Sequence, residues 1–394
     1  MLKMFRIILD NRDYRYFWFV NLGSNTAIWM QTMLFGILVS QLSSSALTNS
    51  LVHVAATLPF FLLCFIAGII GDRFNQYWVM LICQCALSIT AVACATIGYL
   101  GFFNTFNLIV ITFIFASIMS FRMPTSVACV ASLVRVDQVA YASVLNNLCF
   151  NISRSLGPAL VGVLLLVVTA PTIFILSTVI FLLPVIYFYR YRKKKSLTVS
   201  RTKKLEGISQ YIKEKYFIYC CLDIMIIMFS SSAVLALLPY FVKYNLGGDE
   251  IAQSNYMACI GLGAFSTIFV LPVLIKRFSR QQNVLICYGL TIFSTLSFLF
   301  YKYEDEWVIA INYFICGLAW SMSISLINAM IQERYRGEIA ARVIAVYFMM
   351  MYIGQAAGSL FFGAISEYSM LLAFVVALSI LVLSILTRYI GVRI

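Results

Sequence analysis

The clearest pattern along the chain is a succession of long apolar stretches separated by short polar segments. Most of these stretches are at least as long as the ~20 residues that a helix needs to cross a bilayer. The apolar residues within a stretch are continuous and do not alternate, which indicates helices and not the strands of a membrane barrel. The sequence therefore predicts an all-α membrane protein with twelve transmembrane helices, at residues 14–40, 48–71, 77–98, 106–134, 139–168, 171–190, 216–243, 251–275, 281–301, 307–331, 339–366 and 371–388.

Composition and the placement of charge support this interpretation. Apolar residues make up 62% of the chain and charged residues 11%, whereas a soluble domain usually carries about a quarter charged residues. A net charge of +13 would suggest nucleic acid in a soluble protein. Here, with the N-terminus inside, most Lys and Arg fall in the tails and the even-numbered loops, while Asp249, Glu250 and Glu367 fall on the other side. This distribution follows the positive-inside rule and predicts two cytoplasmic termini and no nucleic-acid partner.

The only long polar segment divides the predicted helices into six and six. We expect an N-terminal six-helix bundle at residues 1–190, a basic cytoplasmic linker at 191–215 and a C-terminal six-helix bundle at 216–394. Each basic residue of the linker would contribute about 1 kcal/mol of attraction to anionic lipid headgroups. The N-terminus lacks a short apolar core followed by a cleavage site, so we interpret it as a lead-in to the first helix and not as a cleaved signal.

Two pairs of segments suggest that the halves are repeats. Residues 275–287 (IKRFSRQQNVLIC), laid over residues 71–83, match Arg73 with Arg277 and end in the same Leu-Ile-Cys. The segments 156–162 (LGPALVG) and 357–363 (AGSLFFG) share two glycines at corresponding positions. Two like-oriented halves are typical of transporters whose halves are related by an axis along the membrane normal. The repeat predicts two pseudo-symmetric bundles that rock about a site between them.

These features resemble the major facilitator superfamily. Gly68, Asp72 and Arg73 occupy the matching positions of its loop signature, Gly-x-x-x-Asp-Arg-x-Gly-Arg-Lys/Arg, although the terminal Gly and basic pair are replaced. The segments NRDYRYFWFVNLGSNTAIWM, RMPTSVACVASLV and NNLCFNISRSLGPALVG resemble the enterobactin-exporter and macrolide-efflux branch. The resemblance implies the major facilitator fold, a bacterial inner (plasma) membrane and a small organic solute. The Gly-Pro of SLGPALVG also resembles a motif of antiporters, which favours export.

The same resemblance implies a gate at the inner end of the second helix. Asp72, followed by Arg73, would meet the N-terminal end of the eleventh helix near Arg336 and Arg342. A carboxylate at the positive end of a helix is stabilised by about 0.3–1 kcal/mol. The alternative is that the Asp-Arg pair is an ordinary charged end of a helix.

Two arginines inside predicted spans are the main candidates for solute binding. On insertion scales each costs about 2.5–3.5 kcal/mol, so Arg122 and Arg154 should each face a wet cavity or a partner. A guanidinium matches planar anions with paired hydrogen bonds, which predicts a solute with carboxylate, catecholate or phosphate oxygens. In the structural alternatives, Arg154 ties the fifth helix to the first through Asn21 or Asn25, and Arg122 bonds carbonyls freed by a proline kink.

The full predicted solute site combines these cations with polar and aromatic side chains of several helices. Asn151 shares the helix face of Arg154, and a polar stripe of this kind is expected to point inward. Trp29 is one of several further aromatic residues expected to line a pocket or to pack. The predicted solute-binding residues are Arg154, Arg122, Asn25, Asn21, Asn151, Trp320 and Gln355.

Asp223 is the only acidic residue clearly inside a predicted span, and this makes it the first candidate for proton coupling. The alternative interpretation of Asp223 is that it forms a salt bridge with the basic linker. His53, the only histidine, is the second candidate, because imidazole titrates near neutral pH. Its alternative is a plain hydrogen bond to a neighbouring side chain.

Enzymatic chemistry is not expected. The sequence has no nucleophile–base pair, metal-ligand spacing or phosphate-cradling loop, so we expect no catalysis, no cofactor and no metal. The predicted function is secondary active transport by alternating access in a monomer, as proton-coupled export of a siderophore-like or amphipathic, drug-like anion. The alternatives are an importer of the same solutes, a lysophospholipid flippase, and a sensor that binds without transporting.

Overall fold

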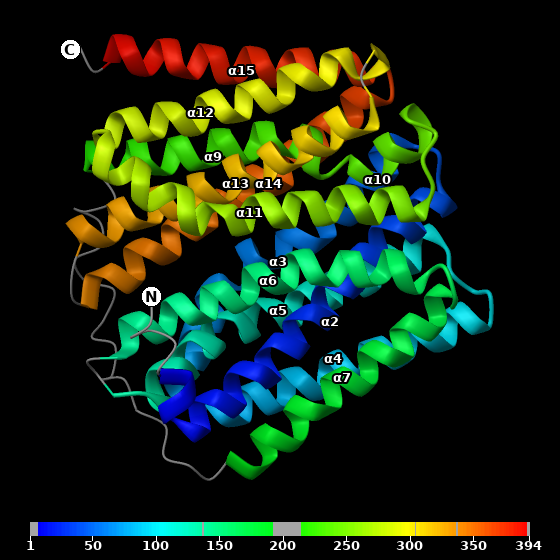
Figure 1. Cartoon of the computed structure of the whole chain (residues 1–394), viewed down its shortest axis with the longest axis vertical. Coiled ribbons are helices and arrows are strands. Elements are labelled where there is room, and N and C mark those ends of the chain that lie inside the picture. Colours follow the sequence, from blue (N-terminus) through cyan, green and yellow to red (C-terminus); the bar gives the residue numbers. More distant parts are fainter. Residues whose placement is uncertain (1–6, 136–137, 192–213, 304, 336–337, 392–394) are drawn as a thin grey trace.

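The computed structural model describes residues 7–135, 138–191, 214–303, 305–335 and 338–391, and every regular element in these ranges is helical (Figure 1). The six long helices before residue 192, here called the N half, are α2 (Arg12–Leu42), α3 (Ala46–Arg73), α4 (Gln76–Tyr99), α5 (Thr105–Leu133), α6 (Val139–Leu164) and α7 (Ala170–Tyr191). The remaining elements, the C half, are α9 (Lys215–Leu235), α10 (Leu238–Tyr240), the π-helix η2 (Phe241–Asn245), α11 (Glu250–Arg277), α12 (Arg280–Ser297), the 3₁₀-helix η3 (Phe298–Tyr303), α13 (Glu306–Arg334), α14 (Glu338–Ser366) and α15 (Met370–Gly391). The predicted all-α fold is confirmed. Most of the predicted linker, residues 192–213, lies outside the described residues, so its boundaries stay a prediction.

Eleven helical segments of the described chain are long and apolar enough to cross a membrane. The continuous segment Lys215–Asn245, which joins α9, α10 and η2, counts as one of them. The long helix that falls short is α6, whose sequence contains Arg154 and three asparagines. A helix that carries so many polar groups requires protein neighbours, because lipid offers no hydrogen bonds.

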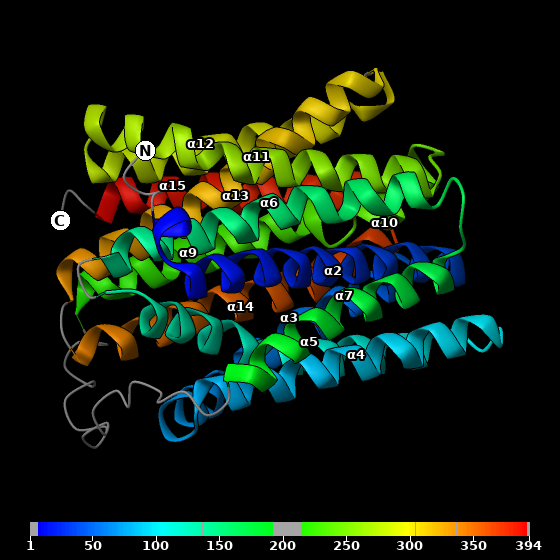
Figure 2. The same cartoon turned by 60° about the horizontal axis from the view of Figure 1, so that its bottom comes forward.

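Within each half the turns between the long helices are short, so consecutive long helices run antiparallel. Residues 43–45, 100–104, 246–249 and 367–369 lie at one end of the bundle, which we call the 43–45 end (Figures 1 and 2). Residues 74–75 and 278–279 lie at the opposite end, together with the first and last described residues. Side-chain caps define several starts: Ser45 accepts from the backbone N–H of Thr48, and Asn104 and Ser279 each form a capping box. Such caps pair donors that a helix leaves unsatisfied at its N-terminus.

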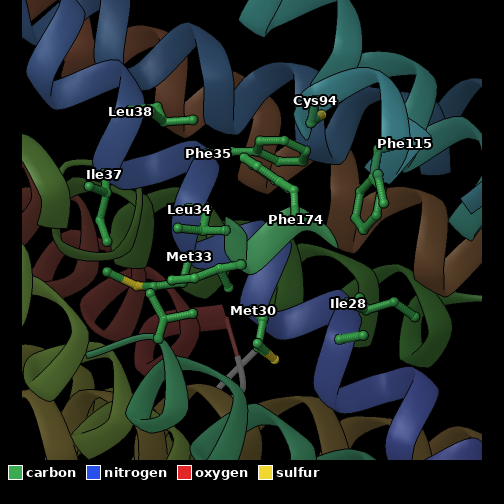
Figure 3. Close-up of a cluster of buried hydrophobic side chains, with 14 of the residues drawn as sticks. Ile28, Met30, Met33, Leu34, Phe35, Ile37, Leu38, Cys94, Phe115 and Phe174 are labelled. Atoms are coloured by element: carbon green, nitrogen blue, oxygen red, sulfur yellow. The ribbon is translucent and has the colours of Figure 1, made fainter. Parts of the chain in front are cut away.

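Each half contains its own apolar core. In the N half, the ring of Phe35 from α2 lies 5.5 Å from that of Phe115 and 5.9 Å from that of Phe174, centroid to centroid (Figure 3). In the C half, Phe241 packs against Phe298 at 5.5 Å. Because lipid tails are as apolar as these side chains, close packing supplies much of the attraction between helices.

The two halves meet mainly along two helix pairs, α3 with α14 and α6 with α11. The repeated glycines lie at equivalent places in this arrangement. A Cβ on Gly157 of α6 would lie 2.6 Å from Trp29 Cβ of α2, and a Cβ on Gly358 of α14 would overlap the Phe229 carbonyl of α9.

The second glycine of each pair faces the opposite half. A Cβ on Gly162 would lie 3.0 Å from Ser254 Cβ of α11, and one on Gly363 would lie 2.6 Å from Ser50 Cβ of α3. Thus one glycine of each pair allows close packing within a half and the other allows it between halves. The repeat in the sequence corresponds to a repeat in packing.

Candidate functional site

Arg122 lies inside the N half and binds α2. Its Nη1 donates to Asn25 Oδ1 at 2.9 Å, and its Nη2 donates to Asn21 Oδ1 at 2.8 Å and to Ser24 Oγ at 3.1 Å. The side chain is 2% exposed. The tie to the first helix that we considered for Arg154 is thus made by Arg122, and its acceptors are side chains and not carbonyls freed by Pro124.

The two asparagines extend this network to α6. Asn21 Nδ2 donates to Asn146 Oδ1 at 2.9 Å, and Asn25 Nδ2 donates to Cys149 Sγ at 3.8 Å. Arg122 therefore stands in a polar network that joins α2, α5 and α6 within one half. Hydrogen bonds to a charged group in such a network are stronger than those between neutral groups.

Arg154 lies where the two halves meet and is surrounded by aromatic rings. Its Cζ is 4.1 Å from the ring centroid of Trp320 on α13, 4.8 Å from that of Trp29 on α2 and 5.3 Å from that of Phe150 on α6. The arginine is 5% exposed. The face of an aromatic ring attracts a cation, but it does not accept a conventional hydrogen bond from the N–H groups of that cation. We call these four residues the Arg154 cage.

The donors of the Arg154 cage are unpaired. Arg154 Nε, Trp29 Nε1 and Trp320 Nε1 are buried without a hydrogen-bond partner. Among the residues that the structure describes, no carboxylate forms an ion pair with Arg154. A positive site with three free donors and apolar walls is suited to an anion that carries an apolar body.

Two other predicted solute-binding residues, Asn151 and Gln355, lie on α6 and α14, the helices that contact α11 and α3 of the opposite half. Asn151 is half-buried on α6, three residues before Arg154. Gln355 of α14 is 6% exposed, and its carbonyl accepts from Ser232 Oγ and Ser359 Oγ.

His53 forms a hydrogen bond between the halves. Its Nδ1 lies 2.8 Å from Ser359 Oγ of α14. Because Ser359 Oγ already donates to the Gln355 carbonyl at 2.7 Å, its hydroxyl accepts from His53, which places a proton on Nδ1. The same α3–α14 contact includes the stacked rings of Phe60 and Tyr352, 4.6 Å apart.

Asp223 faces the interior of the C half. Tyr288 of α12 donates to its Oδ1 at 3.1 Å, and the aspartate is 7% exposed. This position lies between α9 and α12.

The predicted gate cannot be placed. Arg336 lies outside the described residues, and so do the side chains of Asp72, Arg73 and Arg342. The gate stays a prediction. No group of three or more potential metal ligands occurs in the part of the chain that the structure describes.

Phe150 was missed by sequence reasoning, although it precedes Arg154 by four residues on the same helix and so lies on the same face. Tyr288 was also missed. It lies 65 positions from Asp223 in the chain, and no local pattern connects the two residues.

Comparison with known proteins places these sites in a transporter fold. A family model described as transmembrane secretion effector, within the major facilitator superfamily, matches residues 8–393. A POT family transporter in complex with a thioalcohol-conjugated peptide superimposes with a TM-score of 0.75 at 12% identity, covering 96% of each chain. A D-xylose-proton symporter does so with a TM-score of 0.70 at 15% identity, covering 96% of this chain and 97% of its own.

A bacterial homolog of the human lysosomal transporter Spinster, in an inward-facing and occupied conformation, also superimposes. Its TM-score is 0.73 at 12% identity, with 96% of each chain covered. No individual curated protein matches the sequence significantly. At these identities the solved structures establish the fold alone.

Proposed function

Because the chain belongs to the transmembrane secretion effector family of the major facilitator superfamily, we propose that it exports a siderophore-like or amphipathic, drug-like anion by alternating access. The proposed export crosses a bacterial inner membrane, with both termini in the cytoplasm, and is coupled to protons. The observation that carries the proposal is the Arg154 cage. It is a buried cation with unpaired donors at the contact between the two halves.

The chemistry of the Arg154 cage supports an anionic solute. Arginine stays ionised in proteins, so this charge is not lost by deprotonation. An acidic group of the solute would accept from Arg154 Nε and from the two indole N–H groups, while its apolar part would lie against the rings. Since Trp29 belongs to the N half and Trp320 to the C half, the site changes shape whenever the halves move relative to each other.

We propose Asp223 and His53 as the coupling residues, in that order. Asp223 is the buried carboxylate that Tyr288 binds, and its protonation would weaken its hold on that donor. His53 bridges α3 and α14 through Ser359, so a change at the imidazole acts directly on the contact between halves. The proposed gate of Asp72, Arg73, Arg336 and Arg342 would act at the opposite end of α3 and α14.

Transport by the purified protein in proteoliposomes tests this function. The probes are a fluorescent aromatic carboxylate and its neutral ester, with an imposed pH gradient of either sign. We expect the carboxylate to move against the proton flow and the Arg154→Gln variant to lose this movement. Movement with the proton flow would indicate an importer, and transport of lysophospholipid in place of the carboxylate would indicate a flippase. Binding without movement would indicate a sensor.

A further inference from the structure

The turn at residues 43–45 joins the C-terminal end of α2 to the N-terminal end of α3. A helix leaves its last four carbonyls and its first four N–H groups without partners inside the helix. These groups also carry the partial charges of the helix dipole, negative at the C-terminus and positive at the N-terminus. Both kinds of unpaired group are therefore concentrated at this one turn of the N half.

The C half supplies a carboxylate to the start of α3. Glu367, which follows the end of α14, accepts a hydrogen bond from the Leu47 N–H at 2.8 Å and another from Ser45 Oγ. Leu47 is the second residue of α3, so its N–H is one of the unpaired donors. A negative charge from one half thus lies at the positive end of a helix in the other.

The C half also supplies an ammonium group to the end of α2. Lys243 Nζ of η2 donates to the Ser40 carbonyl at 2.8 Å, and Tyr244 Oη donates to the same carbonyl at 2.9 Å. Ser40 lies two residues before the end of α2, so its carbonyl is one of the unpaired acceptors. A positive charge from the C half thus lies at the negative end of α2.

The two contacts form one arrangement with matched signs. We propose that Lys243 and Glu367 are gating residues, which together form a charge clasp on the 43–45 turn and hold the halves together at this end. The clasp releases each time the halves separate there during transport. This inference rests on the proposed function only in requiring that the halves separate, and it does not depend on the solute or the coupling ion.

The neighbouring polar contacts support the same closure. Gln41 Nε2 donates to Glu250 Oε1 of α11, and Ser40 Oγ lies 3.4 Å from Gln253 Oε1. The first of these contacts includes one charged group and the second includes none, and both join side chains only, not the backbone groups at the end of a helix. Lys243 and Glu367 combine a full charge with the end of a helix, so they are expected to contribute most to the electrostatic closure.

A cysteine reporter tests the clasp without any transport assay. Ser254 of α11 is fully buried beside Gly162 of α6, so Ser254→Cys changes little and reacts with a maleimide only when the halves part. The reporter protein is placed in lipid nanodiscs, where both faces are accessible. The labelling rate of the parent protein without this cysteine is subtracted.

Glu367→Gln and Lys243→Gln are each expected to raise the labelling rate of Cys at position 254 by roughly two- to five-fold, the effect typical of one charge at a helix end. The double variant should give about the product, and ~1 M salt should raise the rate of the reporter protein but not of the double variant. Glu306→Gln, which removes an exposed carboxylate at the start of α13 on the same end, is the matched control and should have no effect. Thermal unfolding checks that each variant is folded. If the folded Glu367→Gln and Lys243→Gln variants are labelled no faster than the Glu306→Gln control, the clasp is overturned. Failure of the proteoliposome assay would count against the proposed transport function but would not change this labelling result.

Discussion

Arg122 and Arg154 are both buried arginines in the N half, yet their surroundings differ completely. Arg122 is bound through three hydrogen bonds to one helix of its own half. Arg154 is surrounded by rings from both halves. The Nε of each arginine is buried without a partner, but in the described part of the chain only Arg122 donates through its terminal nitrogens. Burial and residue type alone therefore do not distinguish an arginine that holds helices together from one that is available to a ligand.

The difference follows from what each neighbour can accept. Amide and hydroxyl oxygens accept N–H donors, so the network around Arg122 is largely satisfied within the protein. Aromatic faces stabilise a cation but leave its N–H groups available. An anion can improve the environment of Arg154, whereas at Arg122 it would have to displace existing partners.

The largest effect that we predict is loss of stability on replacing Arg122. Arg122→Met removes three hydrogen bonds and leaves the oxygens of Asn21 and Asn25 buried without this donor. Each buried polar group that is left without its partner typically costs about 1–3 kcal/mol. The free energy of unfolding in detergent should fall by about this amount. Arg154→Met is the control and should cost much less, and equal destabilisation by both would contradict the comparison.

The second prediction concerns anion binding at the Arg154 cage. Hydrogen bonds to charged groups contribute about 1.5–3 kcal/mol, so Arg154→Gln should weaken binding of an aromatic carboxylate by roughly 10- to 100-fold. Arg154→Lys keeps the charge but loses the planar fork, and should have an intermediate effect. Calorimetry with the carboxylate and its neutral ester measures both. Equal affinity for the two ligands in all three proteins would make Arg154 structural.

The third prediction separates the indole N–H groups from the rings. Trp320→Phe and Trp29→Phe keep an aromatic wall beside Arg154 but remove one unpaired donor each. A neutral hydrogen bond contributes about 0.5–1.5 kcal/mol, so each change should weaken carboxylate binding by roughly two- to ten-fold. Binding of the neutral ester should change less. Trp307→Phe is the control, because Trp307 is 81% exposed, and an effect as large at Trp307 would show that the indole N–H groups are not ligands.

The smallest effect is expected where an arginine pairs with a carboxylate at the surface. Arg334 donates to Glu214, and Tyr335 Oη donates to the same carboxylate at 2.6 Å. The hydrogen bonds from Arg334 and then Tyr335 lower the pKa of Glu214 below its ordinary value of 4.5. Because the pKa is lower in the folded state, the pair stabilises the protein above about pH 4.5 and the stabilisation disappears as the pH falls through the folded pKa.

Melting of the wild type and Glu214→Gln between pH 7 and pH 3 measures this contribution. The wild type should melt slightly higher at pH 7, and the difference should vanish at low pH and in ~1 M salt, as expected for an exposed pair. A difference that does not shrink as the pH falls would mean that the carboxylate charge is not its cause.

The sequence by itself determined the helices and their repeat. Continuous apolar runs have to form helices in lipid, because every backbone polar group must be paired within the segment. The paired glycines of 156–162 and 357–363 were also visible, and each proved to lie at a close approach between helices. The apolar pattern also predicts α6, at residues 139–168, although this helix is not among the segments apolar enough to be counted as membrane spans.

Only the tertiary structure decided which polar groups meet. The sequence suggested Asn21 and Asn25 of α2 as partners of Arg154, but the packing of the helices gives them to Arg122. Trp320 reaches Arg154 from the other half of the chain, and Lys243 and Glu367 reach the ends of two helices that precede them by some 200 residues or more. The hydrophobic pattern determines whether a residue lies within a helix. The partners of its side chain depend on how whole helices pack against one another, and that packing depends on side chains along the entire chain.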